Sequence, residues 1–71
     1  MAATCVIVYG PDSMRNRDGD EYPVWYVGPA DDEGEPVGRQ YTVLTWKTAS
    51  DLGYRIARGR RLELVMDGGP A

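Results

Sequence analysis

The stretch TASDLGYRIARG, residues 48–59, decides the fold, because it carries the pattern of an amphipathic helix. Thr48 and Asp51 match a capping box, in which a threonine and an acid three residues later bond free amides of the first helical turn. Leu52 and Ile56 lie one turn apart and predict a buried helix face. Gly59 is suited to end the helix in the left-handed conformation. We therefore predict one short helix over residues 49–58.

Strand patterns lie on both sides of this helix. Residues 39–46 precede it and residues 61–66 follow it, and bulky side chains alternate along both segments. Residues 22–27 form an earlier apolar segment that contains Pro23, which places its start at or after the proline or at a sheet edge. Residues 4–9 are almost continuously apolar, which is typical of a strand covered on both faces.

The predicted element order is therefore β-β-β-α-β. Three consecutive strands form an antiparallel meander, and the helix returns the chain to a parallel fourth strand. Pairing the fourth strand with the first gives the order 3-2-1-4 and places the most apolar strand inside the sheet. The expected class is α+β, with a two-layer architecture in which a four-stranded mixed sheet carries one short helix on one face. We expect a single domain over residues 1–71, with a flexible tail over 67–71.

Composition argues against catalysis. The 71 residues include no histidine and one cysteine, Cys5, so an intramolecular disulfide and a four-ligand Cys/His zinc site are excluded. Serines and threonines have no histidine to activate them. We expect no catalytic residue, no metal site and no cofactor, and we expect Cys5 to be a small buried hydrophobic residue. The chain has neither a signal-peptide pattern nor an apolar run of membrane-spanning length, so we expect a cytoplasmic protein without a membrane partner.

Charge is distributed unevenly along the chain. Residues 1–36 hold eight acidic and two basic residues, whereas residues 37–71 hold three acidic and six basic residues. Most of the acids fall in two predicted loops, over residues 12–20 and 30–36. Such loops either are simply solvated or attract the basic surface of a nucleic-acid-binding protein. The candidate partner-binding residues are Asp18, Asp20, Glu21, Asp31, Asp32, Glu33 and Glu35.

The aromatic residues leave several interpretations open. All seven are tryptophan or tyrosine, so each ring carries a polar group that can face water or a partner. Trp25 and Trp46 either cover the sheet face that the helix does not reach or anchor a protein partner. The same uncovered face could also close a homodimer.

Arginines near the predicted helix end form an alternative site. Arg55, Arg58, Arg60 and Arg61 could bind phosphates or an acidic partner. Complementation of the helix dipole explains most of them without a ligand, and the net charge of −3 disfavours direct nucleic-acid binding.

The leading hypothesis is a non-enzymatic binding protein that occludes a surface of a larger partner. Compact, acidic, cysteine-poor domains of this length are similar in type to the small inhibitors of bacteriophages and other mobile elements, including anti-CRISPR proteins. In this hypothesis the partner is a protein with a basic surface that binds nucleic acid or docks a subunit. The alternatives are a small homodimeric adaptor or accessory subunit and a weak nucleic-acid binder that uses the four arginines.

Overall fold

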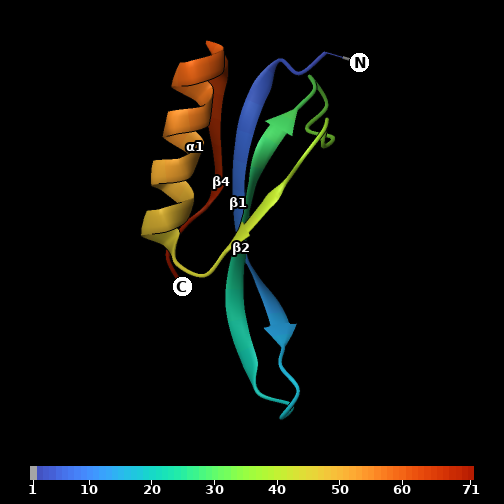
Figure 1. The fold of residues 1–71 in the computed structure, drawn as a ribbon, viewed down its shortest axis with the longest axis vertical. Coiled ribbons are helices and arrows are strands. Elements are labelled where there is room, and N and C mark those ends of the chain that lie inside the picture. The colour runs from blue at the N-terminus through green and yellow to red at the C-terminus, as the bar shows by residue number, and fades with distance from the viewer. Residues whose placement is uncertain (1) are drawn as a thin grey trace.

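The computed structural model describes residues 2–71, which form a four-stranded sheet and one helix (Figure 1). The elements in chain order are β1 (Cys5–Arg15), β2 (Glu21–Ala30), β3 (Tyr41–Val43), α1 (Trp46–Arg60) and β4 (Glu63–Gly68). The sheet order is β3-β2-β1-β4. β2 is antiparallel to β1 and β3, and β4 is parallel to β1. The predicted α+β class, strand order and crossover helix are confirmed.

The β1–β2 hairpin extends well beyond the rest of the sheet (Figure 1). Pairing runs from Cys5 with Ala30 to Arg15 with Glu21, and the register shifts between Tyr9 and Asp12. The predicted exposed loop over residues 12–20 is therefore wrong for its first part, which lies in β1. That segment is polar because no helix covers it and all of Pro11–Arg15 is exposed, so its composition resembles that of a loop.

The hydrophobic core lies between α1 and one face of the sheet. Val6, Val8 and Val27 are fully buried there. Successive strand residues point to opposite faces, so these alternating valines define the face that α1 covers. Position 8 is central, because a β-carbon at Gly53 of α1 would overlap the Val8 Cγ2 methyl group. The close approach of the helix to Val8 therefore depends on the missing side chain of Gly53.

Small residues form the innermost stripe of α1. Ala49, Gly53 and Ala57 are its buried positions, spaced by one turn each. Leu52 and Ile56, the face predicted from the sequence, are half-buried and pack against the core at its margin. The predicted side of the helix is confirmed, but the shortest approach to the sheet is made by the small residues.

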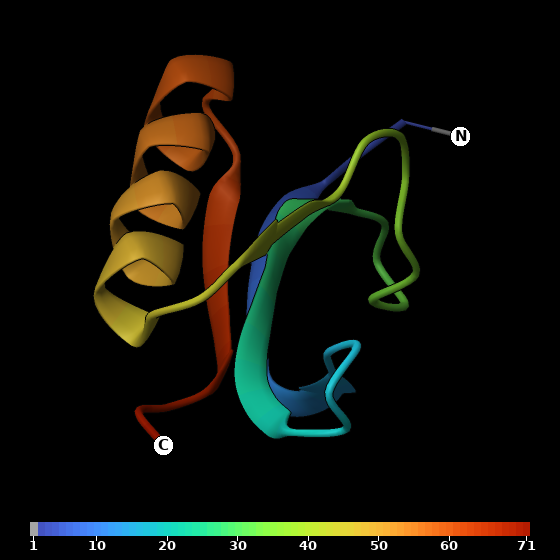
Figure 2. The same ribbon diagram turned by 60° about the horizontal axis from the view of Figure 1, so that its bottom comes forward.

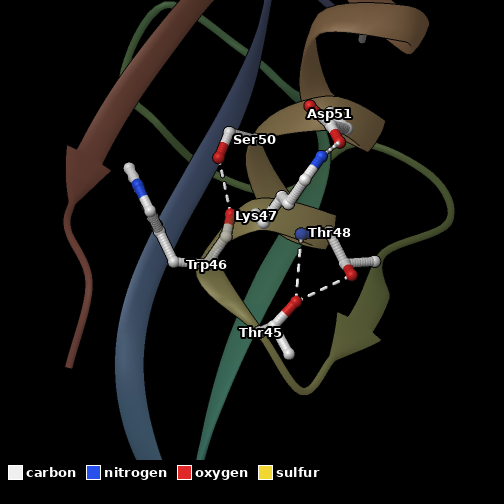
Figure 3. Close-up of polar contacts among 6 residues, drawn as sticks. All are labelled: Thr45, Trp46, Lys47, Thr48, Ser50 and Asp51. Atoms are coloured by element: carbon white, nitrogen blue, oxygen red, sulfur yellow. Dashed lines mark hydrogen bonds and ion pairs between the residues drawn. The ribbon is translucent and has the colours of Figure 1, made fainter.

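The helix begins earlier than predicted. Its N-cap is Thr45, whose Oγ1 accepts a hydrogen bond from the Thr48 amide at 3.1 Å (Figure 3). Thr48 is therefore the partner of the cap rather than the cap itself, and Asp51 pairs instead with Lys47 at 3.0 Å. Because the chain caps the helix at Thr45 and enters it at Trp46, β3 ends at Val43 instead of the predicted residue 46.

The helix ends at Arg60, and its left-handed cap residue is Arg61 rather than Gly59. Arg61 has the left-handed backbone, with φ 56° and ψ 44°, and the Leu62 amide donates to the Ala57 carbonyl at 2.8 Å. Leu62 packs against the core, so tertiary contact extends the helix past the glycine.

The C-terminal segment is bonded to the sheet further than predicted. Asp67 and Gly68 lie in β4, and the Gly69 carbonyl accepts a hydrogen bond from Trp25 Nε1 at 2.9 Å.

Candidate functional site

The sheet face opposite α1 carries no helix, and we call it the open face. Residues that alternate with the core valines lie on it, and the cross-strand pair Tyr9–Tyr26 stands at its centre. Ile7 and its β4 partner Val65 continue the face on one side. Asp12 extends it into the hairpin, since Asp12 pairs with Val24, two residues before Tyr26 on β2. The tyrosine rings, Ile7 and Val65 are half-buried.

The two central tyrosines form a fixed aromatic pair. The Tyr9 and Tyr26 ring centroids are 5.0 Å apart with the planes inclined by 30°. The Tyr26 hydroxyl donates to Asp12 Oδ2 at 3.5 Å. Desolvation on the sheet surface raises the pKa of Tyr26, and the nearby carboxylate of Asp12 and the Tyr9 phenol raise it further. At neutral pH this phenol is therefore a protonated donor held beside a carboxylate.

An acidic turn over residues 31–35 packs on the open face. Asp31 is only 7% exposed, and its Oδ1 accepts the amides of Glu33 at 2.9 Å and Glu35 at 3.0 Å. A β-carbon at Gly34 would lie 3.5 Å from Ile7 Cδ1, so the turn touches the face. Asp31, predicted as a partner-binding residue, instead builds the turn, whereas Asp32, Glu33 and Glu35 are exposed.

The hairpin turn over residues 16–20 repeats this geometry. Asn16 Oδ1 accepts the amides of Asp18 at 2.9 Å and Asp20 at 3.0 Å, which are the bonds that Asp31 makes in the other turn. The turns also share a glycine at the fourth position, with φ of 86° at Gly19 and 83° at Gly34. Each turn thus exposes acids at its third and fifth positions, Asp18 and Asp20 in one, Glu33 and Glu35 in the other.

The shared turn geometry is visible in the sequence, because NRDGD (16–20) and DDEGE (31–35) match in their pattern of residue types. Sequence reasoning found both loops but missed their common pattern of an Asn or Asp, an acid, a glycine and an acid. Both turns lie on the side of the sheet away from α1 (Figure 2). The structure therefore brings two predicted acidic segments, far apart in the sequence, to one side of the molecule.

The predicted residue Glu21 belongs to the stem of the hairpin rather than to its turn. It forms an exposed ion pair with Arg15 at 3.0 Å. Exposed pairs of this kind contribute little to stability. Glu21 remains at the surface, but part of its charge is neutralised within the chain.

The charge of the open face is all of one sign along its strands. Asp12, Glu63 and Asp67 are exposed acids on this face, and the register places no arginine or lysine of β1–β4 there. Together with the two turns, the open face is an acidic surface with tyrosines at its centre.

The tryptophans do not lie on the open face, which corrects their expected placement. Trp25 is 3% exposed and belongs to the core, because it shares the helix-covered side of β2 with Val27. Trp46 begins α1 and is half-buried against the same core. Tyr9 and Tyr26, for which no position was predicted, occupy the open face instead of the tryptophans. The alternation of tyrosines with valines along β1 and β2 was the available signal.

The four arginines of the alternative site are dispersed. Arg55 and Arg58 line a shallow hollow on the exposed side of α1, together with Tyr54 and Asp51. Arg60 lines a different groove, between α1 and β3. The backbone of Arg61 caps the helix, and its side chain lines neither hollow, so no one hollow contains all four arginines.

Other site chemistry is sparse within residues 2–71. This part of the chain has no group of three His, Cys, Asp or Glu side chains placed to hold a metal ion. Cys5 is buried, as predicted, with Sγ near the carbonyls of Ala30 and Asp31. None of the described helices is long and apolar enough to cross a membrane.

Comparison with known proteins adds no family. No protein-family model, curated protein or solved structure is significantly similar to this chain.

Proposed function

We propose that this chain is a non-enzymatic binding protein that places its open face and two acidic turns against a basic surface of a larger protein and thereby occludes it. The observation that carries the proposal is the combination of a central tyrosine pair with acidic residues and no basic strand residue on one face. Tyrosines are frequent anchors of protein interfaces, because they bury a large rigid surface and keep a hydrogen-bonding group.

The spacing of the acidic turns supports an extended basic partner surface. The molecule is 40 Å long, and the turns lie towards opposite ends of that length (Figure 1). Proteins that bind nucleic acid present arginines and lysines along a comparable distance, because they contact successive phosphates. Exposed carboxylates at both ends can compete with those phosphates and accelerate association at low salt. An inhibitor of a nucleic-acid-binding complex, as in anti-CRISPR proteins, is the form of the proposal that this arrangement favours.

Face-to-face homodimerisation is the weaker alternative. Two copies that met through the open face would bring Asp12, Glu63 and Asp67 of one copy close to the same acids of the other. Like charges placed opposite each other in an interface disfavour association. Sedimentation velocity at high and low salt measures this directly, and we expect a monomer at both.

The test compares capture by wild type with capture by two charge variants. The first variant neutralises the matched turn acids with Asp18→Asn, Asp20→Asn, Glu33→Gln and Glu35→Gln. The control neutralises the other side of the molecule with Arg55→Gln and Arg58→Gln. Affinity capture from the source cells with quantitative mass spectrometry should recover a nucleic-acid-binding protein with wild type and with the control, and lose it with the turn variant.

Binding kinetics with the captured protein then distinguish residues that accelerate association from residues that slow dissociation. We expect the turn variant to associate more slowly and with a weaker salt dependence. Tyr9→Ala should instead accelerate dissociation, because it removes packing at the centre of the face. A partner that is retained by the turn variant and lost by the arginine control would contradict the proposal.

A further inference from the structure

A second surface lies on the other side of the sheet, in a groove between the C-terminal half of α1 and the start of β3. The groove has a volume of about 340 Å³, and Pro29, Val37, Arg39, Tyr41, Ile56 and Arg60 are among its lining residues. Pro29 is buried and Val37 and Ile56 are half-buried, so the floor is apolar. Tyr41 is 38% exposed and forms part of the wall.

Two guanidinium groups border this apolar floor. Arg39 Cζ lies 5.2 Å from the centroid of the Tyr41 ring, and this cation–π contact holds the guanidinium beside the groove. Arg60 projects from the last turn of α1. Within residues 2–71, the ion pairs join Arg15 to Glu21 and Lys47 to Asp51, so neither groove arginine has a carboxylate within 4 Å.

This chemistry matches an acidic peptide. Guanidinium groups bind carboxylates through paired, charge-assisted hydrogen bonds, and an apolar floor between them accepts an aliphatic side chain. A nucleic acid fits less well, because it needs a longer stripe of basic residues and the chain carries a net charge of −3. We propose that this groove binds an extended acidic segment of a second protein, with carboxylates on Arg39 and Arg60 and an aliphatic side chain over Ile56 and Val37.

The proposal is independent of the function assigned to the open face. The groove belongs to the α1 side of the sheet, since Tyr41 pairs with the core residue Val27 and Pro29 pairs with the core residue Val6. The two acidic turns lie on the opposite side (Figure 2). One molecule can therefore contact a basic protein and an acidic segment at the same time.

The experiment uses the fluorescein-labelled peptide acetyl-ELELE-amide, with acetyl-QLQLQ-amide as the uncharged control probe. Anisotropy titrations compare wild type with Arg39→Gln and Arg60→Gln. Arg58→Gln is the matched control variant, because it removes the same charge from the same helix outside the groove. We expect each groove variant to weaken binding roughly tenfold, the loss typical of one charge-assisted hydrogen bond, and Arg58→Gln to change it by less than about twofold.

Amide chemical shifts locate the peptide on the protein. In ¹⁵N-labelled wild type, ELELE should shift the amides of residues 37–41 and 56–60 and leave those of the two acidic turns unchanged. The proposal is overturned if these shifts are absent up to millimolar peptide, if QLQLQ binds equally well, or if Arg58→Gln weakens binding as much as the groove variants. It is also overturned if a DNA duplex displaces the peptide and the binding of the duplex requires Arg39 and Arg60, because a nucleic acid would then be the ligand of the groove.

Discussion

Replacing Gly53 with alanine tests the packing of α1 on the sheet. Gly53 lies in the middle of the helix and faces β1, where its missing side chain allows the two backbones to approach. A β-carbon at this position would overlap Val8 Cγ2 and lie 3.2 Å from Leu64 Cδ1. Val8 is fully buried on an interior strand, and its branched side chain has few alternative rotamers. Gly53→Ala therefore forces the helix to move away from the sheet or the valine to leave its preferred rotamer.

Two opposing effects determine the change in unfolding free energy. Overpacking a core by one methyl group costs roughly 1–3 kcal/mol. Alanine in place of glycine within a helix returns up to about 1 kcal/mol, because it restricts the unfolded chain. Because the β-carbon would overlap Val8 and also crowd Leu64, the overpacking cost lies in the upper part of its range, at about 2–3 kcal/mol. We expect a net loss of about 1–2 kcal/mol, which corresponds to a fall of roughly 4–16 °C in the melting temperature of a domain of this size.

Gly59→Ala is the matched control. Gly59 lies in the same helix, and a β-carbon there would meet nothing within 4 Å. This substitution should stabilise the protein by about 0.5–1 kcal/mol, since only the helix propensity changes. Urea denaturation followed by circular dichroism at 222 nm measures both variants. If Gly53→Ala were as stable as wild type while Gly59→Ala gained stability, the close contact between α1 and β1 would be refuted.

Two further predictions concern the acidic turn and the tyrosine pair. Asp31→Ala should lower the unfolding free energy by about 1–3 kcal/mol, because it leaves two turn amides without their acceptor. In the same urea titration, Asp32→Ala, at an exposed position, should change the unfolding free energy by less than about 0.5 kcal/mol. Absorbance at 295 nm should show Tyr26, identified by its loss in Tyr26→Phe, ionising at higher pH than a free tyrosine, and Asp12→Asn should bring its pKa down. Since the folded state holds this proton more tightly than the unfolded chain, the contribution of Tyr26 to stability should be complete below pH 10 and be lost as the pH rises above it. An unchanged Tyr26 titration in Asp12→Asn would contradict the contribution of Asp12 to the raised pKa.

The topology was predictable because it depends on the order and burial of the elements. The apolar segment over residues 4–9 identified an interior strand, and a single amphipathic helix before the last strand required a parallel crossover. The ends of the elements were less predictable. Gly59 has the residue type of a helix terminator, but the packing of Leu62 on the core carries the helix on to Arg60 and puts Arg61 in the left-handed position. Local propensity yields to tertiary contact at such boundaries.

The candidate site was predictable in its charge but not in its aromatic centre. The acidic residues of the turns are recognisable in the sequence, because they flank the turn-forming glycines Gly19 and Gly34. Assigning Trp25 or Tyr26 to the open face instead requires the register of β2, since a shift of one residue exchanges the two faces. The irregularity between Tyr9 and Asp12 changes that register within β1. Gly10 and Pro11 mark its position in the sequence, but the same two residues are equally typical of a strand that ends there.

The fold converts a division of charge along the chain into a division between the faces of the sheet. The acidic half of the sequence supplies the β1–β2 hairpin and both turns, and the basic half supplies α1 on the opposite side (Figure 2). The acidic surface and the basic surface are therefore separated by the thickness of the two layers, and each can attract a partner of opposite charge. Variants of the acidic turns and variants of the groove arginines should consequently act on different binding reactions, and additive effects in the combined variant are the expected sign of two separate surfaces.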